Sequence, residues 1–135
     1  MKIGMDLDGT LDRPHVRDLA LALLTAGHEV HIISGTFPEG IGWQDSAAKY
    51  AKLARLDIPY TEGPGPPREK HAHLHIIDAV PSTYDRDYRL ADIGLRKGAL
   101  CESLGIQLFF EDSERYCEMI PKMAGDTVVL QVRPS

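Results

Sequence analysis

The chain has 135 residues, of which 43% are hydrophobic and 26% charged. This composition is typical of one globular domain and excludes a fibrous or disordered chain. No apolar run approaches the ~20 residues that cross a membrane, and the N-terminus lacks a signal-peptide pattern. We therefore expect a single domain over residues 1–135 in the cytoplasm. The net charge of −5 disfavours non-specific binding to nucleic acid or anionic lipid.

Predicted strands and helices alternate along the chain. In chain order they are a strand over 2–7, a helix over 16–24 ended by Gly27, a strand over 29–33, a helix near 43–54, a strand over 73–80, a helix over 87–104 ended by Gly105, a strand over 106–110, a short helix from 112 disturbed by Pro121, and a strand over 127–132. The alternation predicts a three-layer, Rossmann-like α/β fold, with a mostly parallel sheet and helices on both faces.

Two details of this pattern concern packing. In the helix near 43–54, the inward face is predicted to carry Trp43, Ala47, Tyr50, Ala51 and Ala54. Residues 62–67, rich in Pro and Gly, predict a loop. The cysteines at positions 101 and 117 fit neither a metal knuckle nor a disulfide framework, and we expect both to be reduced packing residues.

Polar residues follow several of the predicted strands. Asp6 and Asp8 end the first strand, Ser34 ends the second, and Glu111 with Asp112 ends the fourth. Ligands of parallel sheets bind beyond the carboxyl ends of the strands, so these side chains should converge there. Two aspartates leaving a buried strand are costly unless a cation or hydrogen bonds satisfy them.

These motifs resemble those of the haloacid dehalogenase superfamily. Asp6–Thr10 matches its DxDGT motif, and Ser34 matches the Ser or Thr that ends the second strand. Lys97 matches its helical lysine, and Glu111 with Asp112 matches its acidic pair, although Glu111 replaces the commoner Asp or Gly. The resemblance covers the chain from residue 3 to residue 132.

The resemblance implies an enzyme: a Mg²⁺-dependent phosphomonoester hydrolase, or phosphatase. Asp6 would be the nucleophile that forms an aspartyl-phosphate, and Asp8 the general acid and base. Mg²⁺ would be bound by Asp6, by the backbone carbonyl of Asp8 and by Asp112, with Glu111 in the outer shell. Lys97 would contact both Asp6 and the phosphate.

The substrate phosphate would be held by Ser34, Lys97 and the backbone of Gly9 and Gly35. Helical periodicity supports Lys97 independently of the resemblance, because it shares a stripe with apolar residues at 93, 100 and 104. Arg96 and Lys70 are the alternatives.

The segments available for an inserted cap domain are short. Residues 11–15 and 81–87 cannot hold a folded cap, so we expect a capless member of the superfamily with an open site. Such a site suits a large substrate, such as a phosphoprotein or a nucleic-acid end, or closure by a second subunit in a homo-oligomer. The acidic net charge disfavours nucleic acid. The loops at 37–42 and 61–70 could cover part of the entrance, which would allow a phosphorylated small molecule.

Other functions on the same fold stay open. The chain could be a non-catalytic or regulatory protein that binds a phosphate ligand. It could also catalyse phosphoryl transfer to an acceptor other than water, or phosphonate chemistry. Separately, His71, His73 and His75 alternate, and on a strand they would share one face. They could bind a transition metal, but the absence of an acidic or Cys partner favours a partly covered strand face.

Overall fold

The fold is built on one six-stranded sheet. The computed structural model describes residues 1–40 and 45–133. The strands are β1 (Lys2–Met5), β2 (Glu29–Thr36), β3 (Tyr60–Glu62), β4 (Ala72–Asp78), β5 (Leu108–Glu111) and β6 (Val128–Gln131). They lie in the order β3-β4-β2-β1-β5-β6, and every neighbouring pair is parallel. The predicted three-layer, Rossmann-like α/β fold is confirmed at this level, with a sheet that is wholly rather than mostly parallel.

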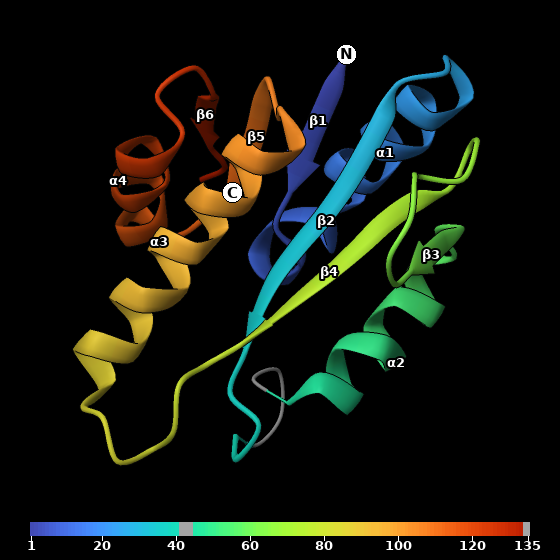
Figure 1. Ribbon diagram of the computed structural model, residues 1–135. Helices are drawn as coiled ribbons and strands as arrows, with labels where there is room; N and C mark the ends of the chain where they lie inside the picture. The colour runs from blue at the N-terminus through green and yellow to red at the C-terminus, as the bar shows by residue number, and fades with distance from the viewer. Residues whose placement is uncertain (41–44, 134–135) are drawn as a thin grey trace.

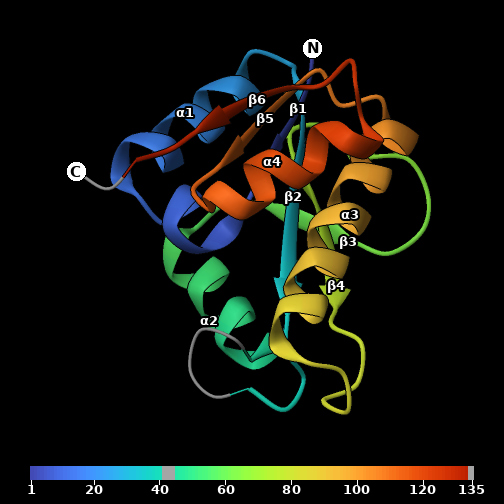
Figure 2. The same ribbon diagram turned by 90° about the vertical axis from the view of Figure 1, so that its left-hand side faces the viewer.

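Four helices cover the two faces of the sheet (Figures 1 and 2). They are α1 (Pro14–Thr25), α2 (Ser46–Leu56), α3 (Arg86–Leu104) and α4 (Glu114–Met123). Consecutive residues of a strand point to opposite faces, and β2 shows the consequence. Ile32 belongs to the apolar cluster shared with α1 and α2, whereas Ile33 belongs to the cluster shared with α3 and α4.

Local signals in the sequence set the helix ends. Asp85 caps α3 by accepting a hydrogen bond from the backbone N–H of Tyr88, and Gly105 ends it with a φ of +70°. Ser113 caps α4 in the same way. Pro121 lies inside α4 but does not end it, because a proline near the end of a helix removes only one of its hydrogen bonds.

Two predictions about the region between β2 and β4 need correction. The loop predicted over 62–67 is present from residue 63, but Glu62 ends the short strand β3, which pairs with the edge of β4 and was not predicted. The inward face of α2 carries Lys49 and Leu53, while Tyr50 and Ala51 are exposed. The predicted place of Trp43 in that face lies outside the described residues.

The chain order places a topological switch point between β1 and β5. From β1 the chain moves to β2, then to the edge strand β3 and back to β4, which lies between β3 and β2. It then crosses to the other side of β1 with β5. Open α/β sheets bind ligands at such a point, beyond the carboxyl ends of the strands. The short connections from η1 (the turn Leu7–Leu11) to α1 and from β4 to α3 contain no further helix or strand. Within the described ranges, no helix is both long and apolar enough to traverse a bilayer.

Candidate ligand-binding site at the carboxyl edge of the sheet

The turn after β1 positions the first two aspartates. The backbone N–H of Asp6 donates to the carbonyl of Phe110 on β5 across 2.9 Å, which continues the sheet by one residue. η1 then folds back, with the N–H of Leu11 donating to the carbonyl of Asp6. Gly9 has a φ of +75°, a conformation that favours glycine. Asp6 and Asp8 therefore leave the sheet at its centre, beside the end of β5.

Three carboxylates meet at the switch point. Asp6 comes from the end of β1 and Glu111 and Asp112 from the end of β5, and one oxygen of each lies within 4.8 Å of the others. Burial, followed by the charge of Asp6, raises the pKa of Asp112, and the same two causes raise the pKa of Glu111 well above its ordinary range. The cluster is thus electrostatically unfavourable when every member is ionised and no cation is bound.

Gly9 allows Asp112 to approach this cluster. A Cβ atom at position 9 would lie 2.1 Å from Oδ2 of Asp112, which no real side chain can tolerate. The glycine therefore serves two needs, the positive φ of the turn and the space for a carboxylate. The motif Asp-Gly-Thr brings the turn and the acidic pair of β5 together.

Lys97 is the cation at the base of the cluster. Its Nζ atom donates to Oδ1 of Asp6 across 3.0 Å and to Oε1 of Glu111 across 2.7 Å, and its side chain has no exposed surface. The same atom lies 4.4 Å from the centre of the Tyr116 ring. Burial alone lowers the pKa of Lys97, but the charges of Asp6 and Glu111 outweigh it and raise the pKa, so the lysine stays charged.

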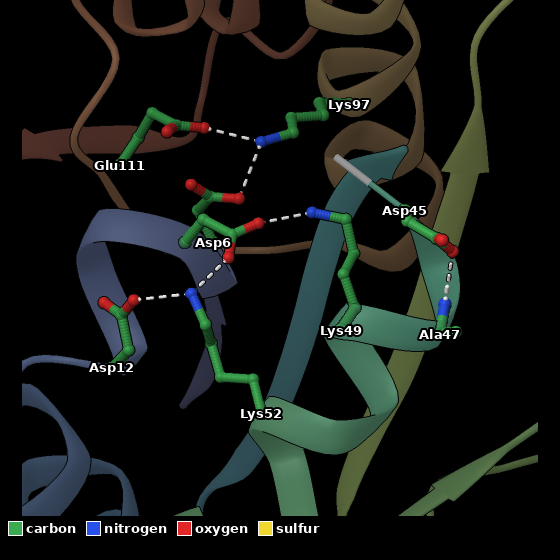
Figure 3. Close-up of polar contacts among 9 residues, drawn as sticks. Asp6, Asp12, Asp45, Ala47, Lys49, Lys52, Lys97 and Glu111 are labelled. Carbon is green, nitrogen blue, oxygen red and sulfur yellow. Dashed lines mark hydrogen bonds and ion pairs between the residues drawn. The ribbon is translucent and has the colours of Figure 1, made fainter. Parts of the chain in front are cut away.

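Two lysines that the sequence analysis did not identify reach the site from α2. Lys49 and Lys52 both donate to the carboxylate of Asp8. Lys52 also donates to Oδ2 of Asp12 across 2.8 Å (Figure 3). Lys49 is almost fully buried. The signal was present as the helical spacing of Lys49, Lys52 and Leu53, but lysines are normally expected on the surface of a helix.

A cavity of about 690 Å³ opens above these groups. Ser34 lines it with a buried hydroxyl that has no hydrogen-bond partner in the described structure, and Gly35 lies beside it. Leaving a buried hydroxyl unpaired is costly, so this atom favours a ligand in the cavity. The charged residues that line the cavity are Asp6, Asp8, Asp12, Asp112, Lys49, Lys52, Lys97 and Arg115.

The residues present fit a magnesium ion. The donors are carboxylate oxygens, which are the ligands that Mg²⁺ prefers, and Lys97 supplies one positive charge against the three carboxylates within 4.8 Å of one another. A divalent cation would relieve the repulsion that raises the pKa of Asp112. Asp6 and Asp112 face the cavity, whereas Glu111 is fully buried behind them and bound to Lys97.

The structure brings together all the residues that the sequence analysis placed in this site. Seven of them line the cavity, namely Asp6, Asp8, Gly9, Ser34, Gly35, Lys97 and Asp112. Of the alternatives to Lys97, Arg96 instead pairs with Asp92 at the surface, and Lys70 is exposed. Ser34 lies inside β2 rather than at its end, because pairing with β4 continues to Thr36.

Comparisons with known proteins give little that can be transferred to this chain. No protein-family model matches it, and no curated protein matches it. A crystal structure of a protein from the universal stress protein family of Burkholderia pseudomallei resembles it with a TM-score of 0.44 and 14% identity, over 97% of this chain and 94% of that one. A likeness of this degree carries no argument about what this chain binds or does.

These findings correct the resemblance stated from the sequence. The similar solved structure belongs to the universal stress protein family and not to the haloacid dehalogenase superfamily, which contradicts the predicted membership. The functional predictions that rested on that membership, an enzyme and specifically a Mg²⁺-dependent phosphomonoester hydrolase, are corrected together with it, since no family model supports the membership. The resemblance rested on four short motifs in the expected order, and motif matches carry a real false-positive risk. What the chain does must be argued from its own site.

Proposed function

We propose that this chain binds a Mg²⁺ ion together with a phosphorylated small molecule in the cavity at the carboxyl edge of its sheet. The observation that carries the proposal is the unpaired hydroxyl of Ser34 in a cavity that both carboxylates and lysines line. The carboxylates come from the ends of β1 and β5, and the lysines come from α2 and α3. A bound cation together with an anion would interact with both the carboxylates and the lysines.

The carboxylates that line the cavity suit the cation of the proposed ligand pair. Asp6 and Asp112 offer oxygen atoms to the cation, and Glu111 together with Lys97 holds Asp6 in place. Phosphate oxygens would complete the coordination of the ion, which Mg²⁺ commonly requires. Gly9 and Gly35 line the same cavity.

The lysines of α2 favour an anionic ligand. Lys49 and Lys52 pair with Asp8 at the rim of the cavity, and their ammonium groups line it. Phosphate is a fitting anion because lysine binds it as a compact point charge. The cavity volume of about 690 Å³ lies within the range of small-molecule sites. This size favours a phosphorylated metabolite, such as a sugar phosphate or a nucleotide, over a macromolecular end.

Isothermal titration calorimetry tests the proposal. We expect wild-type protein to bind one Mg²⁺ per chain and to bind inorganic phosphate more tightly when Mg²⁺ is present. Asp112→Asn should weaken Mg²⁺ binding at least tenfold, which is about 1.4 kcal/mol. The exposed Asp126→Asn is the matched control and should bind like wild type. Equal Mg²⁺ affinity in Asp112→Asn and wild type, or no phosphate binding with Mg²⁺ present, would overturn the proposal.

A panel of phosphate esters would then define the ligand. Sugar phosphates, nucleotides and short phosphopeptides are compared at a fixed Mg²⁺ concentration. Preference for a small ester agrees with a cavity of about 690 Å³, whereas preference for the phosphopeptide would contradict the small-molecule assignment.

A further inference from the structure

Three histidines gather on the α3 side of the sheet, away from the candidate site. β2 and β4 pair in parallel with His31 opposite His73, and His75 follows two residues later on the same face. The three rings are stacked, with centroids 4.5 to 5.6 Å apart. One nitrogen of each ring lies within 4.8 Å of the others. His71 precedes the strand and does not join them, which corrects the predicted alternation.

An acidic partner accompanies this cluster, contrary to the sequence analysis. Nε2 of His31 lies 2.7 Å from Oε2 of Glu29, which sits two residues earlier on β2. Nε2 of His73 lies 2.9 Å from the carbonyl oxygen of Gly63. The strand face is partly covered, as favoured from the sequence, and it also carries a polar network with its own hydrogen-bond acceptors.

These acceptors determine which nitrogens carry protons. An ionised carboxylate and a carbonyl only accept hydrogen bonds, so Nε2 of His31 and Nε2 of His73 must donate. In the neutral rings, the Nδ1 atoms are then bare lone-pair sites. Nδ1 of His31 accepts from Nε2 of His75 across 2.9 Å. Nδ1 of His73 is buried and has no partner in the part of the chain that the structure describes.

This pattern is the one that metal-binding histidines show in proteins. A ligating imidazole usually donates its second N–H to a carboxylate or a backbone carbonyl, which fixes the tautomer and the ring orientation. Glu29 and Gly63 supply those two acceptors. Packing alone would leave the Nδ1 atom of His73 desolvated and unpaired, at a cost in free energy. A bound cation removes that cost.

We propose that His31, His73 and His75 form a binding site for a transition-metal ion of the Zn²⁺ class, with Glu29 and the Gly63 carbonyl as outer supports. Three neutral imidazoles suit Zn²⁺, Co²⁺ or Ni²⁺ and not Mg²⁺. His75 is partly exposed, which provides access for the ion and for a water molecule as fourth ligand. On binding, the metal replaces the proton on Nε2 of His75, and Nδ1 of the same ring takes up a proton, so that ring remains neutral.

The nitrogens are close enough for one ion, and binding requires the three stacked rings to turn their nitrogens toward it. Zn–N bonds of about 2.0–2.1 Å in a tetrahedral site place neighbouring ligand nitrogens roughly 3.3 Å apart. The nitrogens of His31 and His75 are already 2.9 Å apart, and the cluster spans at most 4.8 Å. The site is independent of the proposed Mg²⁺ site, because it lies on other residues and takes a different class of ion.

Cobalt spectroscopy on tag-free protein tests the proposal. The parent protein in this experiment is the Asp112→Asn variant in excess Mg²⁺, which keeps Co²⁺ away from the carboxylate site. The oxygen ligands of that site would in any case give only weak bands. We expect one equivalent of Co²⁺ to give the intense visible bands of four-coordinate, nitrogen-ligated cobalt, and one equivalent of Zn²⁺ to abolish them. The His75→Ala variant should not show these bands, and its Zn²⁺ affinity should fall at least 100-fold. The control His71→Ala should keep the bands and the wild-type Zn²⁺ affinity.

A second variant covers the case in which His75→Ala fails to fold, as judged by circular dichroism. Glu29→Gln leaves the three ligands in place and should weaken Zn²⁺ binding by about 10- to 100-fold, the usual effect of losing an outer partner. Absence of nitrogen-ligated cobalt bands in the parent protein would overturn the proposal. Equal Zn²⁺ affinity in the parent protein, His75→Ala and Glu29→Gln would also overturn it.

Discussion

The Nζ atom of Lys97 lies 2.7 Å from Oε1 of Glu111, and neither side chain has any exposed surface. The pair joins the middle of α3 to the end of β5. Lys97 also binds Asp6, so one ammonium group connects the strands on both sides of the switch point. Removing one member of a buried ion pair leaves an uncompensated charge, which costs more than the pair contributes.

Lys97→Met should therefore lower the free energy of unfolding by about 3–5 kcal/mol in metal-free buffer. Urea denaturation followed by circular dichroism measures the loss. Arg96→Met is the matched control, because its side chain is 43% exposed and its pair with Asp92 lies at the surface. That variant should change stability by less than about 1 kcal/mol. A similar small loss in both variants would show that the Lys97 pair is not an important contact.

Substituting Gly9 and Gly27 in turn distinguishes the steric effect of a side chain at the site from the cost of backbone strain alone. Gly9 and Gly27 both have positive φ, but a Cβ at position 9 would lie 2.1 Å from Asp112, whereas one at position 27 meets nothing within 4 Å. Gly27→Ala should cost only the backbone strain, about 1–2 kcal/mol. Gly9→Ala should cost more, and it should displace Asp112 and weaken Mg²⁺ binding.

Thermal unfolding and Mg²⁺ calorimetry on both glycine variants check this expectation. Unchanged Mg²⁺ affinity in a folded Gly9→Ala protein would contradict the proposed role of Asp112 as a ligand. A loss of Mg²⁺ affinity in Gly27→Ala would show that the effect is not local.

Much of the fold could be predicted because its signals are local. The alternation of apolar runs and helical stripes predicted the layers, and Gly105 ends α3 where expected. Lys97 shares its stripe with Ile93, and both are fully buried. The end of β1 and the end of β5 were each visible as an apolar run followed by acidic residues. Parallel pairing then brings these two ends together.

The missed features depend on contacts between distant segments. Periodicity assigns charged residues to the outer face of a helix, so it could not reveal that Lys49 turns inward to meet Asp8, 41 residues earlier in the chain. Likewise, His31 joins His73 only through the register of β2 against β4. Four short motifs in order suggested a family, but local motifs cannot by themselves establish what a whole chain does.

The lysines of α2 should control anion binding more than cation binding. Lys49→Met removes a positive charge that attracts phosphate. It also leaves the Asp8 carboxylate less neutralised, which adds repulsion of phosphate. We expect at least a tenfold loss of phosphate affinity in the presence of Mg²⁺, with a smaller effect on Mg²⁺ alone. Calorimetry measures both, and the exposed Lys122→Met is the control. Unchanged phosphate affinity in Lys49→Met would place the anion elsewhere.

The histidine cluster should make stability depend on pH when metals are removed with EDTA. Burial, followed by the charges of His31 and His73, lowers the pKa of His75 to about 4 from its ordinary value of 6.5. Between these two values the unfolded chain binds the proton more readily than the folded protein. The free energy of unfolding should therefore fall as pH drops from about 6.5 toward 4, with a slope of at most about 1.4 kcal/mol per pH unit from this group.

The difference between wild type and His75→Gln isolates this contribution, because the carboxylates titrate in both proteins. Urea denaturation at intervals between pH 4 and pH 7 should show a shallower acid loss in the variant, while the exposed His15→Gln control should follow wild type. Zn²⁺ should stabilise wild type most at neutral pH and progressively less in acid, since protons compete for the same ring nitrogens. Identical pH profiles for His75→Gln and wild type would mean that solvent reaches His75 freely enough to keep its pKa near 6.5. The folded protein would then take up the proton as readily as the unfolded chain, and the buried network of imidazoles would not persist in solution.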